Sequence, residues 1–213
     1  SRALELDPTA SVARIWRGRA YLEKMERGIL FVDVDRIEIQ AEARHWRTLA
    51  QSDLSVDGGP LEEDERRLLP IYELVFADRA KEALEFLLRH LQTHDYDGRA
   101  WKLLGRTLAA ADDHAKAIEA YSNAIRTGQS RAGIFYLRAM SFARLRKWDS
   151  CEKDLTRAVE LDPKLWAAWL HRSITRIWLN RLPEALGDAT RAVFLAPSSQ
   201  FVWHYQGVVR GLL

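Results

Sequence analysis

The stretch DGRAWKLLGRTLAAADDHAKAIEAYSNAI, residues 97–125, decides the fold. Apolar residues recur in it at helical spacing on both sides of the Asp112-Asp113 pair, which indicates two helices joined by a short turn. Its tryptophan also opens a series of aromatic residues spaced 34 apart, at Trp101, Phe135, Trp169 and Trp203. A fixed period of this length is the sequence signature of a repeat architecture.

Further series share this period. A small residue stands four positions after each aromatic, at Gly105, Ala139, Ser173 and Gly207. Two more small-residue series are Ala117, Cys151 and Ala185, and Ala124, Ala158 and Ala192, while Pro163 and Pro197 close two of the units. Small side chains let helix backbones approach closely, and proline ends a helix. The pattern therefore predicts stacked pairs of antiparallel helices.

An aromatic residue at position 4, small residues at 8, 20 and 27, and proline at 32 of each unit resemble the tetratricopeptide repeat (TPR). The opening stretch and AVELDPKLWAAW, residues 158–169, carry this resemblance most fully. It implies an all-α fold, an α-solenoid of antiparallel helix pairs wound into a right-handed superhelix.

The register extends through the whole chain. Pro8 in ALELDP matches Pro163 in AVELDP, at a separation of four periods plus about 19 residues. We expect a tail of a preceding repeat (1–10), a repeat (11–44), an insertion (45–63) with a Ser/Asp/Gly/Pro loop at 52–60, a degenerate repeat (64–97), three repeats (98–131, 132–165 and 166–199) and a lone terminal helix (200–213). Because both ends fall inside a unit, we expect a module of a larger protein.

Two positions of the unit vary together. Position 7 holds arginine in three units, at Arg17, Arg138 and Arg172, and position 23 of the same units holds Asp33, Asp154 and Asp188. The unit with Leu104 at position 7 has Ala120 at position 23. The simplest cause is contact, so we predict an Arg–Asp pair between the two helices of each such unit.

The stretch GILFVDVDRIEI, residues 28–39, suggests another chemistry. A buried strand ending in Asp33 and Asp35 would resemble the haloacid-dehalogenase phosphatases, in which the first Asp attacks phosphorus. The continuation Arg36-Ile37 departs from that signature, and the chain lacks the strand–helix alternation of a parallel sheet. We therefore interpret Asp33 as the partner of Arg17 and keep the phosphatase as the last alternative.

Other reactive residues have structural interpretations. His90 and His94 have a spacing that can bind a metal, but no third ligand is in register. Cys151 stands where other units have alanine, which favours a small buried residue over a nucleophile. Asp112 and Asp113 lie in the turn between two helices and are placed to cap the second one. The sequence thus predicts no catalytic site, no metal site and no cofactor.

The resemblance implies that positions 2, 5, 9, 12 and 13 of the first helices line a concave groove that binds a peptide or helix of a partner protein. In this sequence these include Arg99, Lys102, Arg106, Tyr136, Met140, Arg144, Leu170, Ile174, Trp178, Phe201 and His204. This set grades from basic to exposed apolar and aromatic side chains, which suits an acidic-hydrophobic partner. The clamp for chaperone tails found in one branch of the family is incomplete, since Arg106 and Leu137 replace its asparagines.

Charge and composition leave one further alternative. The 213 residues have a net charge of +2, but residues 99–213 carry 18 Lys/Arg against 10 Asp/Glu. A basic half is compatible with a helical-repeat RNA-binding module, although the 34-residue period and the apolar groove favour a protein partner. No apolar run has the length of a membrane span. A single cysteine fits a reducing compartment, so we expect a cytoplasmic protein.

Overall fold

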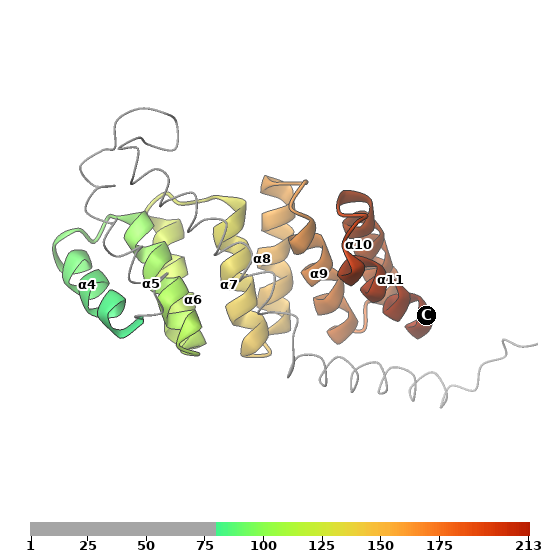
Figure 1. The fold of residues 1–213 in the computed structure, drawn as a ribbon, viewed down its shortest axis with the longest axis horizontal. Helices are drawn as coiled ribbons and strands as arrows, with labels where there is room; N and C mark the ends of the chain where they lie inside the picture. Colours follow the sequence, from blue (N-terminus) through green and yellow to red (C-terminus); the bar gives the residue numbers. More distant parts are fainter. Residues whose placement is uncertain (1–79) are drawn as a thin grey trace, which may run out of the picture.

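The computed structural model describes residues 80–213, which form eight helices and no strand. The helices are α4 (Ala80–Thr93), α5 (Gly98–Ala110), α6 (His114–Arg126), α7 (Ala132–Arg144), α8 (Trp148–Leu161), α9 (Trp166–Trp178), α10 (Leu182–Leu195) and α11 (Gln200–Leu212). They stand side by side in chain order as a single elongated array (Figure 1). The expectation of an all-α solenoid is confirmed.

The helices pack in hairpins, as the small-residue series predicts. Pairs α5–α6, α7–α8 and α9–α10 make the most extensive contacts, and each second helix also packs on the first helix of the next pair. The two small-residue series of the second helices are fully buried at Ala117, Cys151, Ala185, Ala124, Ala158 and Ala192. Any larger side chain there would push the backbones apart, which is why the sequence keeps these positions small.

The turn inside each hairpin has a backbone geometry that the sequence analysis did not foresee. Asp112, Arg146 and Asn180, which are 34 residues apart, have φ of 63°, 55° and 60°. The next amide in each turn donates to a carbonyl five residues back, for example from Asp113 to Leu108 at 2.9 Å. This left-handed residue closes a Schellman motif, in which a helix ends and the chain reverses.

The turns between hairpins depend on proline and on the aromatic series. Pro163 and Pro197 lie two residues after the ends of α8 and α10, so proline follows the helix end as expected. The indole Nε1 of each tryptophan in the series donates to the carbonyl oxygen six residues earlier, as from Trp169 to Pro163 at 3.1 Å and Trp203 to Pro197 at 2.8 Å. The aromatic residue thereby fixes the turn as well as filling space.

Several sequence predictions fall outside the described residues. These are the tail 1–10, the repeat 11–44, the insertion 45–63, and the acidic residues Asp33 and Asp35 with Arg17. The segment KEALEFLLRHL of the degenerate repeat is the helix α4, as expected. Across the part of the chain that is described, none of the helices could cross a membrane.

Candidate functional site: the face of the first helices

The Arg–Asp pairs hold the first helix of a unit onto the second. Arg138 on α7 donates from Nε and Nη2 to the two carboxylate oxygens of Asp154 on α8, both at 2.7 Å. Arg172 on α9 binds Asp188 on α10 in the same two-pronged way, at 2.8 and 2.7 Å. Parallel hydrogen bonds of this kind fix both the distance and the orientation of the two helices. The third pair, Arg17 and Asp33, lies outside the described residues.

A hydroxyl on the preceding unit completes each pair. Arg138 Nη1 donates to Ser122 Oγ at 3.0 Å, and Arg172 Nη1 donates to Thr156 Oγ1 at 3.3 Å. Gln206 on α11 replaces arginine at the same repeat position and donates to Thr190 Oγ1 at 3.1 Å. Arg138 therefore links the three helices α6, α7 and α8, and Arg172 links α8, α9 and α10. Gln206 links the two helices α10 and α11. We call this set the inter-repeat ladder: Ser122, Arg138, Asp154, Thr156, Arg172, Asp188, Thr190 and Gln206.

A second charged contact joins α8, α9 and α10. Arg176 Nη1 binds Asp188 at 2.8 Å, and its Nε binds Glu152 on α8 at 2.9 Å. Arg181, after α9, binds the other oxygen of Glu152 at 2.6 Å. Asp188 therefore receives two guanidinium groups while its side chain is only 4% exposed. This network was not predicted from the sequence because the residues equivalent to Glu152 in the neighbouring units are Ile118 and Leu186, so no acidic series marks it.

The predicted groove residues all lie on the first helices α5, α7, α9 and α11, but their exposure differs from expectation. Tyr136, Met140, Leu170 and Ile174 are buried, with at most 6% of each residue exposed. They belong to the two core clusters of the C-terminal half, where they pack with the alanines of the second helices. The expectation that they form an exposed apolar surface was wrong, because their side chains fill the core.

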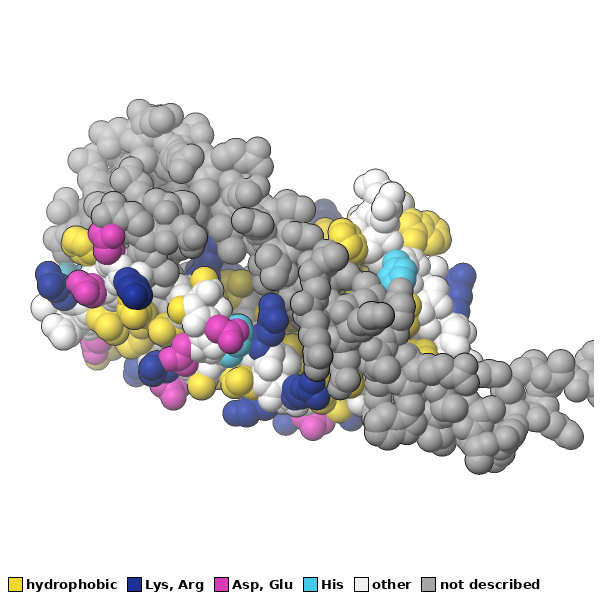
Figure 2. All heavy atoms as spheres, turned by 60° about the horizontal axis from the view of Figure 1, so that its bottom comes forward, with side chains coloured by type: hydrophobic (Ala, Val, Ile, Leu, Met, Phe, Trp, Pro, Cys, Tyr) yellow, Lys and Arg dark blue, Asp and Glu magenta, His cyan; other side chains and the backbone are white. Residues whose placement is uncertain are grey.

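The remaining groove residues, except for Arg106, are more accessible. Arg99, Lys102 and Phe201 are half-buried, Arg144 and His204 are exposed, and Arg106 is buried. Trp178 is half-buried and stacks on Trp148 of α8, with ring centroids 5.1 Å apart and an interplanar angle of 2°. Accessible cationic side chains thus occur near both α5 and the end of α7. On the face seen in Figure 2, Lys and Arg side chains are scattered among acidic and hydrophobic ones.

A histidine on this row of helices is wholly enclosed. His171, on α9, is 3% exposed, and its ring meets that of Tyr136 edge to face at 5.6 Å. Burial lowers the pKa of His171 to about 4, because the charged imidazolium loses its hydration. This side chain is therefore neutral at physiological pH. The sequence analysis did not single it out, since no periodic series includes it.

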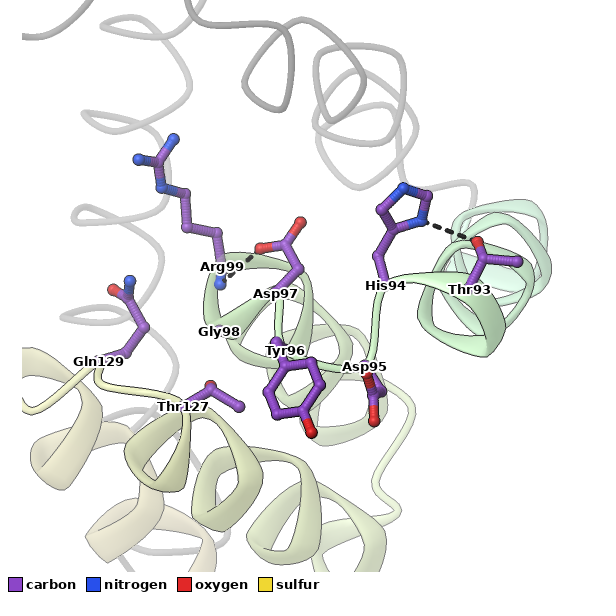
Figure 3. A pocket seen from close by; sticks show the side chains of 9 residues that line it. All are labelled: Thr93, His94, Asp95, Tyr96, Asp97, Gly98, Arg99, Thr127 and Gln129. Carbon is purple, nitrogen blue, oxygen red and sulfur yellow. Dashed lines mark hydrogen bonds between the residues drawn. The ribbon is translucent and has the colours of Figure 1, made fainter.

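A depression of about 430 Å³ lies at the junction of α4, α5 and α6. Its wall includes the predicted groove residue Arg99 and the turn residues Tyr96 and Asp97. In Figure 3 Arg99 and Gln129 lie on one side of it and Thr93 and His94 on the other. Asp97 caps α5 by accepting hydrogen bonds from two backbone amides of its first turn. The polar groups at this junction thus serve the local fold.

The residues with reactive side chains have structural roles. His90 and His94 stack with parallel rings 4.5 Å apart, and His90 Nε2 lies 2.8 Å from Asp97. Over residues 80–213 no group of three potential ligands could hold a metal ion. Cys151 is fully buried and lies 3.3 Å from Thr175 Oγ1. Its burial raises the pKa of the thiol to about 12, so it is not a nucleophile near neutral pH.

The fold and its repeating contacts define a class of protein. Residues 80–213 form a tetratricopeptide-repeat solenoid, so the resemblance seen in the sequence is confirmed. No family model matches the chain. Among curated proteins, the human mitochondrial import receptor subunit TOM70 is 32% identical over 112 residues, which is 50% of this chain and 18% of that receptor. The chain thus spans less than a fifth of the length of this relative.

Solved structures give the same fold. The TPR protein YrrB, described as having an unusual peptide-binding site, is 20% identical with a TM-score of 0.62, over 67% of this chain and 74% of that one. The TPR domain of Arabidopsis OM64 is 27% identical with a TM-score of 0.53, over 55% and 96% of the two chains. The first TPR of Spaghetti (RPAP3), solved with the HSP90 peptide SRMEEVD, is 23% identical with a TM-score of 0.52, over 53% and 90%.

Proposed function

We propose that this chain is a noncatalytic protein-interaction module that binds a peptide or a helix of a partner across its first helices. The observation that carries the proposal is the inter-repeat ladder. It joins α7, α9 and α11 to the second helices at a constant 34-residue register, so equivalent side chains recur at fixed spacing along the solenoid. Such a rigid row is suited to an extended ligand.

Chemistry of the row favours an acidic partner segment with hydrophobic anchors. Arg99, Lys102 and Arg144 supply cationic groups near its N-terminal end, and Phe201 is a half-buried aromatic at the other. Opposite charges steer association and set the register of a peptide, while apolar contacts supply most of its affinity. Because Tyr136, Met140, Leu170 and Ile174 are buried, we propose that the accessible residues of the row make the contacts.

Peptide binding by relatives supports the class of ligand but not its sequence. RPAP3 was solved with an HSP90 peptide, and YrrB is described as having a peptide-binding site. In this chain Arg106 is buried and Leu137 stands where the chaperone clamp needs asparagine. We therefore propose a ligand other than a chaperone tail. The module would act within a larger protein, a role supported by the small fraction of TOM70 that it matches.

The test is capture of partners by matched charge-reversal variants. Lys102→Glu with Arg144→Glu changes the first helices, whereas Arg126→Glu with Lys153→Glu makes the same change in charge on exposed sites of second helices. After circular dichroism establishes that all forms are folded, captured proteins are compared by mass spectrometry. We expect the first variant alone to lose partners. Loss in both variants, in neither, or after nuclease treatment of the sample would contradict the proposal.

A further inference from the structure

The turn between α7 and α8 carries a cluster of exposed cations. Arg144 ends α7, and Leu145, Arg146 and Lys147 follow it; all four residues are exposed. We call Leu145, Arg146 and Lys147 the basic tip. It lies on the edge of the array where the hairpins reverse, which is the lower edge in Figure 1. The complete hairpins α5–α6 and α9–α10 stand on either side of it, so its surroundings are those of an internal hairpin.

Arg146 occupies the left-handed position of this turn at a structural cost. The equivalent residues of the neighbouring turns are Asp112 and Asn180, with φ of 63° and 60°, against 55° at Arg146. Aspartate and asparagine tolerate this conformation because their short polar side chains can form local hydrogen bonds, whereas the long arginine side chain has no such compensation. A strained residue at a position where a better one is available indicates a role outside the fold.

Lys147, the next residue, gives up a second stabilising contact. At the equivalent position Asp113 caps α6 by accepting a hydrogen bond from the Lys116 amide at 3.2 Å. Lysine has no acceptor, and the Lys147 side chain makes no hydrogen bond that caps α8. It also takes part in none of the ion pairs found within residues 80–213, whereas Arg181 at the same position of the α9–α10 turn binds Glu152 at 2.6 Å. Two adjacent positions therefore carry positive charge at the expense of local stability.

The three hairpin turns differ in charge. The α5–α6 turn has the carboxylates Asp112 and Asp113, and in the α9–α10 turn Glu152 pairs with Arg181. Within residues 144–149 three cations outnumber one carboxylate, Asp149. A nucleic-acid strand or an anionic membrane would extend over several turns and meet the carboxylates of the α5–α6 turn, which repel it. A short acidic segment, by contrast, can contact the basic tip alone.

We propose that the basic tip binds a short acidic segment of a partner protein, in which carboxylates flank a hydrophobic side chain. The carboxylates would pair with Arg146 and Lys147, and the hydrophobic side chain would contact Leu145, which is 39% exposed. The basic tip lies beside the row of first-helix faces that the proposed function uses, and only Arg144 adjoins both. Either proposal can therefore fail while the other stands.

The experiment follows the backbone amide resonances of the full 213-residue chain by NMR during titration with the peptide EELEE, acetylated and amidated at its ends. We expect the shifts to concentrate at residues 144–149. Arg146→Asp with Lys147→Asp should weaken binding at least about tenfold, because attraction is replaced by repulsion. This variant reproduces the Asp112-Asp113 pair of the neighbouring turn, so it should unfold at a temperature no lower than that of the unaltered chain.

The matched control is Arg126→Glu with Lys153→Glu, which makes the same change in charge at exposed sites on second helices and should leave binding unchanged. Shifts spread over the whole chain, no shifts at all, or equal binding by the basic-tip variant and the control would overturn the proposal. Single-stranded RNA and vesicles containing phosphatidylserine are titrated in parallel. Tighter binding of either one than of the peptide, lost in the basic-tip variant, would overturn the proposal in favour of an extended polyanion.

Discussion

At the scale of single residues, the two Arg–Asp pairs differ in a way that the repeat pattern conceals. Within residues 80–213, Asp154 accepts from the side chain of Arg138 alone, whereas Asp188 accepts from both Arg172 and Arg176. Removing a buried carboxylate leaves its cationic partners without compensation, at a cost of about 3–5 kcal/mol when the site is dry. The cost should therefore depend on how many guanidinium groups each aspartate holds.

We expect Asp188→Asn to destabilise the chain more than Asp154→Asn, because it removes the carboxylate that Arg172 and Arg176 share, although Arg176 keeps its contact with Glu152. Chemical denaturation measures both free energies of unfolding. Asp154→Asn should lower the free energy of unfolding less in a chain that already carries Arg138→Leu than in the unaltered chain. In that background no cation is left without its carboxylate. Equal losses with and without Arg138 would show that the pair does not couple.

The buried histidine predicts a pH dependence of stability. His171 has a folded pKa of about 4, below its ordinary value of 6.5, so the folded state takes up a proton less readily than the unfolded state. Its contribution is fully present above pH 6.5 and is lost as the pH falls toward 4, by about 3 kcal/mol in total. Unfolding of the parent and of His171→Phe, compared from pH 7 to pH 4, should show the dependence weakened in the variant. If the free energies of unfolding of the two proteins depended on pH in the same way, His171 would not be the source of the dependence.

At the scale of elements, the left-handed turn residue gives a stabilising substitution. Arg146 has φ of 55°, a conformation that costs a side chain about 1–2 kcal/mol and costs glycine almost nothing. After the greater chain entropy of glycine is counted, Arg146→Gly should raise the free energy of unfolding by about 0.5–1 kcal/mol. Lys153→Gly within α8 is the control and should lower it by about 1 kcal/mol. A destabilising Arg146→Gly would exclude strain at this turn.

The glycines of α5 and α11 should respond in opposite directions to the same substitution. Gly105→Ala places a methyl group within 2.6 Å of the buried Tyr121 ring and should destabilise the hairpin. Gly207→Ala meets no neighbour and should stabilise α11 by up to about 1 kcal/mol through helix propensity. Thermal melts of the two variants measure this contrast. Changes of the same sign would mean that both positions have the same surroundings.

The elements also show why part of the architecture could be predicted from the sequence. The residue types at Trp101, Gly105 and Ala117 recur because the same contacts between helices are made in every unit. Their 34-residue spacing is therefore enough to locate the helices in the sequence. The partners Ser122 and Thr156 were missed, although they recur with Thr190 at the same 34-residue spacing, because small hydroxyl residues are common on helices and were not followed as a series. The burial of Tyr136 and Leu170 was also missed, since the family positions fix a helix face but not how closely its neighbours cover that face.

At the scale of the whole molecule, the inter-repeat ladder has one apolar counterpart, which precedes its two polar sets among the described helices. Leu88, Leu104 and Ala120 occupy in α4, α5 and α6 the positions that Ser122, Arg138 and Asp154 occupy in α6, α7 and α8. Replacing a complete buried polar network by apolar residues is often neutral or stabilising. We therefore expect the polar version to set the register of the units rather than to add to their stability.

This interpretation predicts that the triple variant Ser122→Leu/Arg138→Leu/Asp154→Ala unfolds at least as cooperatively as the single variant Asp154→Ala and with a higher free energy of unfolding. The apolar trio restores a matched set, whereas the single change strands Arg138. Urea titration followed by circular dichroism compares the two. A triple variant less stable than the single one would show that the ladder contributes net stability.

The proposed function requires that the row of first helices bind a partner protein. Hydrogen–deuterium exchange, measured with and without a partner captured by the unaltered chain, tests it most directly. We predict slower exchange on binding in α5 and α7, near Lys102 and Arg144, with little change in α6 and α8. Protection confined to the second helices, or an unchanged pattern throughout residues 80–213, would contradict the account.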